Sequence, residues 1–65
     1  MNKTIYVTFT YCGVRYAVSC DNDKQANDIA MDVCSLASAR YVYIIHSDKP
    51  RGAEVMGISE YKQRF

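Results

Sequence analysis

The chain lacks a long apolar run and carries no excess of charge. It contains 65 residues, and its longest apolar stretch runs only from Tyr41 to Ile45. A membrane-spanning helix needs about 20 apolar residues, so we expect no such helix. Lys3 is followed by alternating threonines and apolar residues instead of the continuous apolar segment of a secretion signal. These absences predict a soluble protein that stays in the cytoplasm.

Cysteine, glycine and proline are also scarce. The three cysteines are an odd number and have no Cys-x-x-Cys spacing, which argues against a disulfide framework and against a zinc site. A reducing cytoplasm fits this cysteine content. The three glycines never approach the spacing of a phosphate-cradling loop, and the single proline lies in one polar loop. There are no low-complexity tracts or linkers, so residues 1–65 are expected to form a single domain.

The net charge of +1 conceals a segregation along the chain. Between residues 21 and 39 four aspartates face one lysine, so this segment carries −3, whereas the segments on either side carry +2 each. Neither the net charge nor the 23% of charged residues indicates nucleic acid or an anionic membrane as a partner. The chain therefore combines one acidic segment with mildly basic segments on either side.

Two strands joined by a tight turn are the clearest pattern in the sequence. Apolar and polar residues alternate from residue 4 to residue 11, and the alternation resumes from residue 14 to residue 20. This period is typical of half-buried strands. Between the two segments Gly13 can adopt the positive φ that a two-residue turn requires.

The register of this hairpin can be tested within the sequence. A two-residue loop makes both partners apolar in every pair on one face, which predicts Phe9 and Val18 in the core and Thr8 and Thr10 exposed. The apolar pairs are Tyr11 with Val14, Phe9 with Tyr16, Val7 with Val18, and Ile5 with Cys20.

A helix is predicted to follow the hairpin. Asp21-Asn22-Asp23 is a helix start, and Asn22 with Gln25 has the spacing of a capping box. No glycine closes the helix, so its end is left open, and Met31 falls on its solvent side. One apolar stripe recurs at steps of three and four residues and should cover a sheet: Ala26, Ile29, Ala30, Val33, Leu36 and Ala37.

The C-terminal part predicts two further strands. Residues 41–46 are β-branched and aromatic with apolar residues on both faces, which favours an interior strand. Residues 47–52 form a polar loop, and residues 53–58 predict a fourth strand, weakened by a glycine and placed at an edge. Whether the tail from Ser59 to Phe65 packs is left open.

Together these elements predict an α+β fold. It is a two-layer ββαββ arrangement with a four-stranded, mainly antiparallel sheet and one helix on one face. With strands numbered along the chain, the order 2-1-3-4 is preferred because it places the most apolar strand inside the sheet. A β-grasp-like order, 2-1-4-3, is the alternative.

No residue pattern indicates an enzyme. His46 with a cysteine could form a nucleophilic pair, but Cys20 faces the predicted core and no glycine-rich oxyanion loop is present. Asp28 and Asp32 lie one helical turn apart, yet two carboxylates alone hold a cation poorly. We therefore expect no catalytic residues, no metal and no cofactor.

The sheet face opposite the helix is the predicted binding surface. Tyrosine, threonine and arginine on an uncovered face suit a protein partner or stacked bases. Nucleic acid is less favoured because no dense Lys/Arg patch neutralises phosphates, and the aromatic motif of RNA-recognition domains is absent. The candidate residues are Tyr6, Thr8, Thr10 and Arg15, joined from the third strand by Tyr41 and Tyr43 or, if that strand is turned over, by Val42 and Ile44.

The expected function is that of a non-catalytic protein-binding module acting stoichiometrically as an inhibitor or adaptor. The alternative is a single-stranded nucleic-acid binder that uses the tyrosine-rich face. In size and absence of catalytic motifs the chain is similar in kind to small inhibitors encoded by phages and other mobile elements, including anti-CRISPR proteins. A homodimer is also expected, because so short a chain forms only a small core. An acidic helix face could imitate phosphate charge toward a basic partner: Asp21, Asp23, Asp28 and Asp32.

Overall fold

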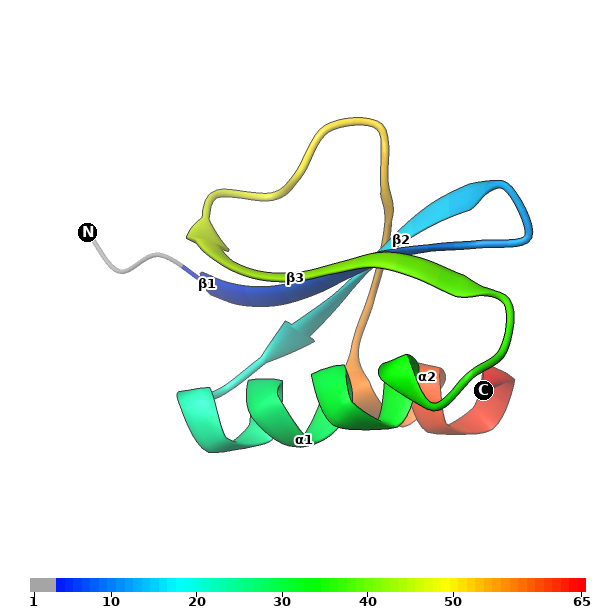
Figure 1. Cartoon of the computed structure of the whole chain (residues 1–65). Helices are drawn as coiled ribbons and strands as arrows, with labels where there is room; N and C mark the ends of the chain where they lie inside the picture. The colour runs from blue at the N-terminus through cyan, green and yellow to red at the C-terminus, as the bar shows by residue number, and fades with distance from the viewer. Residues whose placement is uncertain (1–3) are drawn as a thin grey trace.

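The computed structural model describes residues 4–65 and shows an α+β fold with a mixed four-stranded sheet and two helices. Both helices lie on one face of the sheet (Figure 1). The elements are β1 (Thr4–Tyr11), β2 (Val14–Cys20), α1 (Asp23–Cys34), β3 (Ala39–Ser47), β4 (Glu54–Met56) and α2 (Ile58–Arg64).

The hairpin of β1 and β2 has the predicted register. All four apolar pairs form as expected, and Phe9 and Val18 are fully buried. The turn residues Cys12 and Gly13 have φ values of 53° and 80°, so both adopt the left-handed conformation of a tight hairpin turn. Thr8, in contrast, is only 1% exposed, and the expectation that it faces solvent is wrong.

Helix α1 begins at the predicted cap. The Asn22 side chain accepts a hydrogen bond from the Gln25 N–H at 2.8 Å, and the Gln25 side chain accepts one from the Asp21 N–H at 2.7 Å. The helix ends at Cys34, where Ser35 forms the C-cap and its hydroxyl donates to the Asp32 carbonyl. The residues that the helix buries belong to the predicted apolar stripe: Ala26, Ile29 and Val33.

The strand order corrects both predicted topologies. The order is β3-β1-β2-β4, so β3 lies at an edge of the sheet and not inside it. β4 lies at the opposite edge, as expected of an edge strand, but it pairs in parallel with β2. The hairpin leaves one free edge on β1 and another on β2, and each later strand takes one of them. The connection from β3 to β4, drawn in yellow in Figure 1, therefore crosses the sheet on the face opposite the helices.

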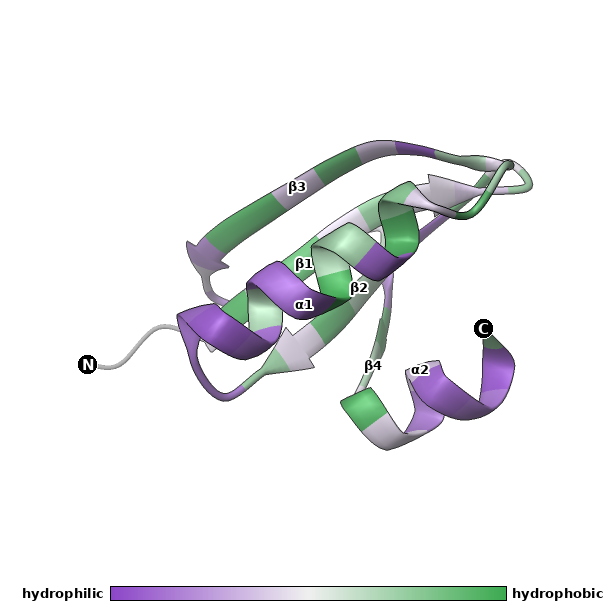
Figure 2. Cartoon of the chain, turned by 60° about the horizontal axis from the view of Figure 1, so that its bottom comes forward, coloured by the Kyte–Doolittle hydropathy of each residue, from purple (hydrophilic) through white to green (hydrophobic). Residues whose placement is uncertain are grey.

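The tail left unassigned by the sequence forms α2. Tyr61 is 1% exposed and Phe65 packs against the hydrophobic core. The Phe65 ring lies 5.6 Å from that of Phe9 and 5.4 Å from that of Tyr16, measured between centroids. Figure 2 shows α2 beside α1 on the same side of the sheet. Aromatic contacts thus anchor a helix that is too short to be stable alone.

Candidate functional site

The sheet face opposite the helices is built from three cross-strand rows. The strand pairing places Thr10 between Arg15 and Arg40, and in the next row it places Thr8 between Ala17 and Tyr43. The third row consists of Ser19, Tyr6 and Ile45. This face contains five of the six residues predicted to bind a partner, with Arg40 as an addition: Tyr6, Thr8, Thr10, Arg15 and Tyr43.

Part of this face is buried, which corrects the expectation that Tyr6 and Thr8 are exposed. Tyr6 is 7% exposed and Thr8 is 1% exposed. Ala17 on β2, the neighbour of Thr8, is fully buried. The connection from β3 to β4 passes on this side of the sheet in Figure 1, at the end where β3 finishes. A connection between opposite edges must cross one face, so the strand order is the reason for this burial. Tyr6 and Thr8 are therefore buried side chains on the sheet face that this loop crosses.

The hairpin end of the same face stays open. Arg15 and Arg40 are exposed on either side of the half-buried Thr10, and we call these three residues the arginine row. With strands about 4.8 Å apart, the two arginine backbones are separated by roughly 10 Å. Tyr43, which is 56% exposed, lies in the adjoining row.

Polar contacts hold part of the arginine row in place. The Arg15 guanidinium donates to the Thr8 hydroxyl at 3.4 Å, and that hydroxyl donates to the Tyr43 carbonyl at 3.5 Å. Among residues 4–65 neither Arg15 nor Arg40 forms an ion pair. Guanidinium groups bind carboxylates and phosphates with two parallel hydrogen bonds, so this row can receive an anionic group.

Tyr41 lies at an irregularity in β3. The pairing shifts between Thr8 and Thr10, which leaves Tyr41 and Val42 together opposite Phe9 in a β-bulge. Tyr41 has a φ of 55° and is 63% exposed. A left-handed conformation is uncommon for a bulky residue and marks this position as locally strained. The bulge removes Tyr41 from the regular alternation that Tyr43 follows, so the two predicted tyrosines do not form one row.

The predicted acidic helix face is divided among different contacts. Asp23 lies 3.3 Å from His46 on β3, whereas Asp32 accepts a hydrogen bond from the Tyr61 hydroxyl at 2.5 Å. Asp28 lines a groove beside α2, and Asp21 precedes the helix. Asp28 and Asp32 therefore share the side of α1 that faces α2, whereas Asp23 is directed toward β3, and the four carboxylates do not form a single acidic surface.

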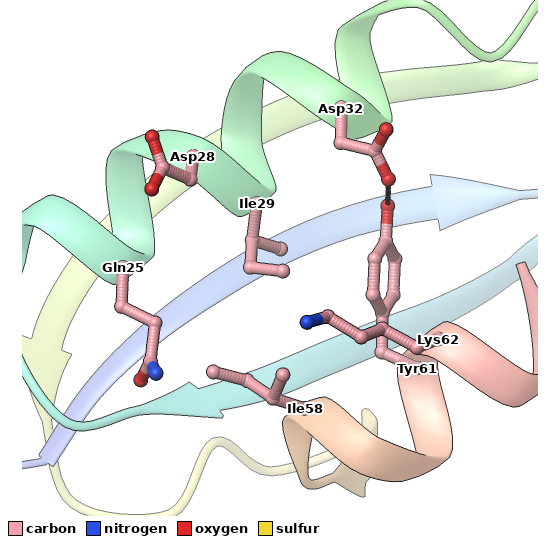
Figure 3. A pocket seen from close by; sticks show the side chains of 7 residues that line it. All are labelled: Gln25, Asp28, Ile29, Asp32, Ile58, Tyr61 and Lys62. Atoms are coloured by element: carbon pink, nitrogen blue, oxygen red, sulfur yellow. Dashed lines mark hydrogen bonds between the residues drawn. The ribbon is translucent and has the colours of Figure 1, made fainter.

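A groove of about 430 Å³ separates α1 from α2. Figure 3 shows the Tyr61 ring standing between the two helices with its hydroxyl directed at Asp32. Burial, the hydrogen bond to Asp32 and the charge of Asp32 all raise the pKa of the Tyr61 hydroxyl above its usual range. The groove is lined by Gln25, Asp28, Ile29, Asp32, Ile58, Tyr61 and Lys62.

The raised pKa of Tyr61 predicts a loss of stability in alkaline solution. In the unfolded chain a tyrosine ionises near pH 10, while folded Tyr61 keeps its proton to higher pH. Tyr61 therefore makes its full contribution to the free energy of unfolding below about pH 10. This contribution decreases as the pH rises above that value. Urea unfolding of the wild type and of Tyr61→Phe at pH 8 and pH 11 should show that the difference in free energy narrows. A difference that is constant or larger at pH 11 would contradict this assignment.

The cysteines and the histidine occupy separate places. Cys20 is 6% exposed, and burial, with a smaller effect of Asp21, raises the pKa of its thiol. Cys12 in the turn and Cys34 at the end of α1 are exposed. Among residues 4–65 no group of three His, Cys, Asp or Glu side chains is arranged to hold a metal ion.

No protein-family model, curated protein or solved structure matches this chain. Within the described part of the chain, neither helix combines the length and the apolar character needed to cross a membrane.

Sequence reasoning missed Arg40 as a candidate binding residue. It is the second residue of β3, and only its pairing with Thr10 brings it into the same row as Arg15. The bulge decides this placement, because regular alternation would have put Tyr41 opposite Thr10. The only available signal was its position at the start of an apolar strand.

Proposed function

We propose that the chain is a non-catalytic protein-binding module that acts stoichiometrically, as an inhibitor or adaptor. Its partner is bound through the arginine row and presents an acidic segment. The observation that carries this proposal is the placement of Arg15 and Arg40 on one open face with no carboxylate paired to either among residues 4–65.

The chemistry of the row favours a protein partner. Two guanidinium groups roughly 10 Å apart can each hold a carboxylate of an acidic segment. Tyr43 beside them supplies a large contact area with a polar tip, and tyrosine and arginine are the residue types that contribute most to interface energies. Such a module inhibits by occupying its partner's surface, in the manner of the small inhibitors that phages and other mobile elements encode.

Single-stranded nucleic acid is the second candidate, and Tyr43 next to two arginines is the observation that favours it. A base could stack on the tyrosine ring while the arginines contact phosphates. Two arginines neutralise about two phosphates, which predicts a slope of only about −1.4 for log K against log salt. So small a phosphate footprint makes this candidate the weaker one.

Removing both arginine charges should strongly reduce partner capture. We expect Arg15→Gln/Arg40→Gln to recover at least roughly tenfold less partner than the wild type from a lysate of the source cells, because truncating one side of a charge pair is costly. Lys24→Gln/Lys62→Gln removes equal charge from the helix side and should capture normally. The measurement is quantitative mass spectrometry of affinity-purified material, with circular dichroism to verify folding.

The outcomes separate the two candidates. Equal recovery by the arginine variant, or an equal loss in the lysine control, would reject the arginine row as the binding site. If nuclease treatment abolishes capture, the nucleic-acid candidate replaces the protein partner. Titration of fluorescent single-stranded DNA and RNA at two salt concentrations then measures the slope directly.

A further inference from the structure

The outer edge of β3 has no partner strand. β3 is nine residues long and pairs only with β1, so along its other side the backbone N–H and C=O groups of the described residues are left without a neighbouring strand. A long edge strand of this kind is a template for adding another strand. Apolar stretches of β3 are visible along this free edge in Figure 2.

Exposed apolar side chains gather along this edge. Three of the five exposed large hydrophobic residues belong to β3, namely Tyr41, Tyr43 and Ile44, with exposed fractions of 63%, 56% and 38%. Met31 on α1, which is 73% exposed, does not belong to this edge, because it lies on the side of the helix opposite the buried residues.

We propose that two copies of the chain pair their β3 strands antiparallel, about a two-fold axis through Ile44, to form a continuous eight-stranded sheet. Ile44 then lies opposite Ile44 of the partner subunit, and Tyr43 lies opposite Ile45 of the partner subunit. Such an interface is isologous, the commonest type in soluble homodimers. This inference does not depend on the proposed function, and it places two arginine rows on the same face of the extended sheet.

Charge complementarity supports a second copy as the occupant. In a regular strand Tyr41 would lie opposite Thr10. Because of the bulge, Arg40 takes this position in the strand. In the proposed register this position is opposite Ser47 of the partner subunit, beside Asp48 of the partner subunit. Arg40 has no ion-pair partner within residues 4–65 of its own chain, and the symmetric contact supplies a carboxylate to each copy. An acidic segment bound at the arginine row would compete with this carboxylate for Arg40, while Arg15 stays free in both copies.

The neighbouring registers are less favourable. An axis through Tyr43 places Arg40 opposite Ile45 of the partner subunit, which sets a charge against an apolar side chain. An axis through Ile45 places Arg40 opposite Lys49 of the partner subunit, which sets two like charges against each other. Only the axis through Ile44 matches apolar with apolar at the centre of the strand and brings opposite charges together at its ends.

The first test is the oligomeric state in solution. One chain has a mass of 7.4 kDa, and we expect light scattering to show twice that value for the wild type. Ile44→Lys places like charges directly opposite each other and should raise the dimer dissociation constant at least roughly tenfold while circular dichroism stays unchanged. Val14→Lys is the matched control, since Val14 is 42% exposed at the distant hairpin turn, and it should remain dimeric.

The second test addresses the register. In a Cys12→Ser/Cys34→Ser background, Ile44→Cys should form an intermolecular disulfide on mild oxidation, because directly opposite residues approach within bonding range. Tyr43→Cys places its two thiols on a diagonal and should cross-link far less. A wild-type monomer at high concentration, or a dimer unaffected by Ile44→Lys, overturns the proposal and leaves the edge to a strand from another protein. Preferred cross-linking at residue 43 overturns the register and, with it, the proposed dimer.

Discussion

Replacing Phe9 by alanine should unfold most of the protein at room temperature. Phe9 is fully buried and its ring contacts those of Tyr16, Tyr61 and Phe65 at centroid distances of 5.6, 6.4 and 5.6 Å. Truncating a buried phenylalanine costs about 3–5 kcal/mol, because transfer energy is lost and a cavity remains. A domain of this size has a total stability of only about 5 kcal/mol. Thermal and urea unfolding followed by circular dichroism measure the loss.

Two variants of the same hairpin provide the controls. Val14→Ala changes an exposed side chain and should alter the free energy of unfolding by less than about 0.5 kcal/mol. Thr8→Ala should lie between the two, at about 1–3 kcal/mol, because the buried hydroxyl is the acceptor for Arg15. If Phe9→Ala and Val14→Ala are equally stable, the assignment of the core face of the sheet is incorrect.

Replacing Tyr61 by alanine should release α2 from the sheet. Tyr61 is 1% exposed, its ring lies 6.4 Å from that of Phe9 between centroids, and its hydroxyl donates a hydrogen bond to Asp32, so it links α2 to both the core and α1. Loss of the buried ring should cost about 3–5 kcal/mol. Hydrogen exchange should then show lost protection throughout α2, whereas the hairpin amides keep theirs in molecules that remain folded.

Tyr61→Phe separates the ring from the hydroxyl. It keeps the aromatic contacts and removes only the hydrogen bond to Asp32, which should cost about 1.5 kcal/mol, near the lower limit for a bond to a charged acceptor. Protection of the α2 amides should be retained in this variant. A loss as large as that of the alanine variant would show that the hydrogen bond, and not ring packing, holds the helix.

The helix start and the hairpin were predictable because their determinants are local. A two-residue turn allows one register, and matching of apolar partners on both strands selects the same one. Asn22 and Gln25 form their capping contacts within one helical turn, without help from the rest of the fold.

The position of β3 was predicted wrongly from its apolar residues. Apolar residues on both faces favoured an interior strand, yet β3 is an edge strand with exposed Tyr43 and Ile44. The proposed dimer would make β3 an interior strand of a larger sheet. The bulge at Tyr41 was equally invisible, since nothing in its own side chain favours a positive φ.

The sequence by itself determined the α+β class, the hairpin with its core and the start of the helix, because each depends on residues close together in the chain. Only the tertiary structure decided the strand order, the burial of Tyr6 and Thr8, and the formation of α2. β4 has three residues and α2 has seven, too few for either to hold its conformation by local propensity. Their places depend on contacts with β2 and with the aromatic core, and the loop that reaches β4 must cross the face on which Arg15 and Arg40 are left open.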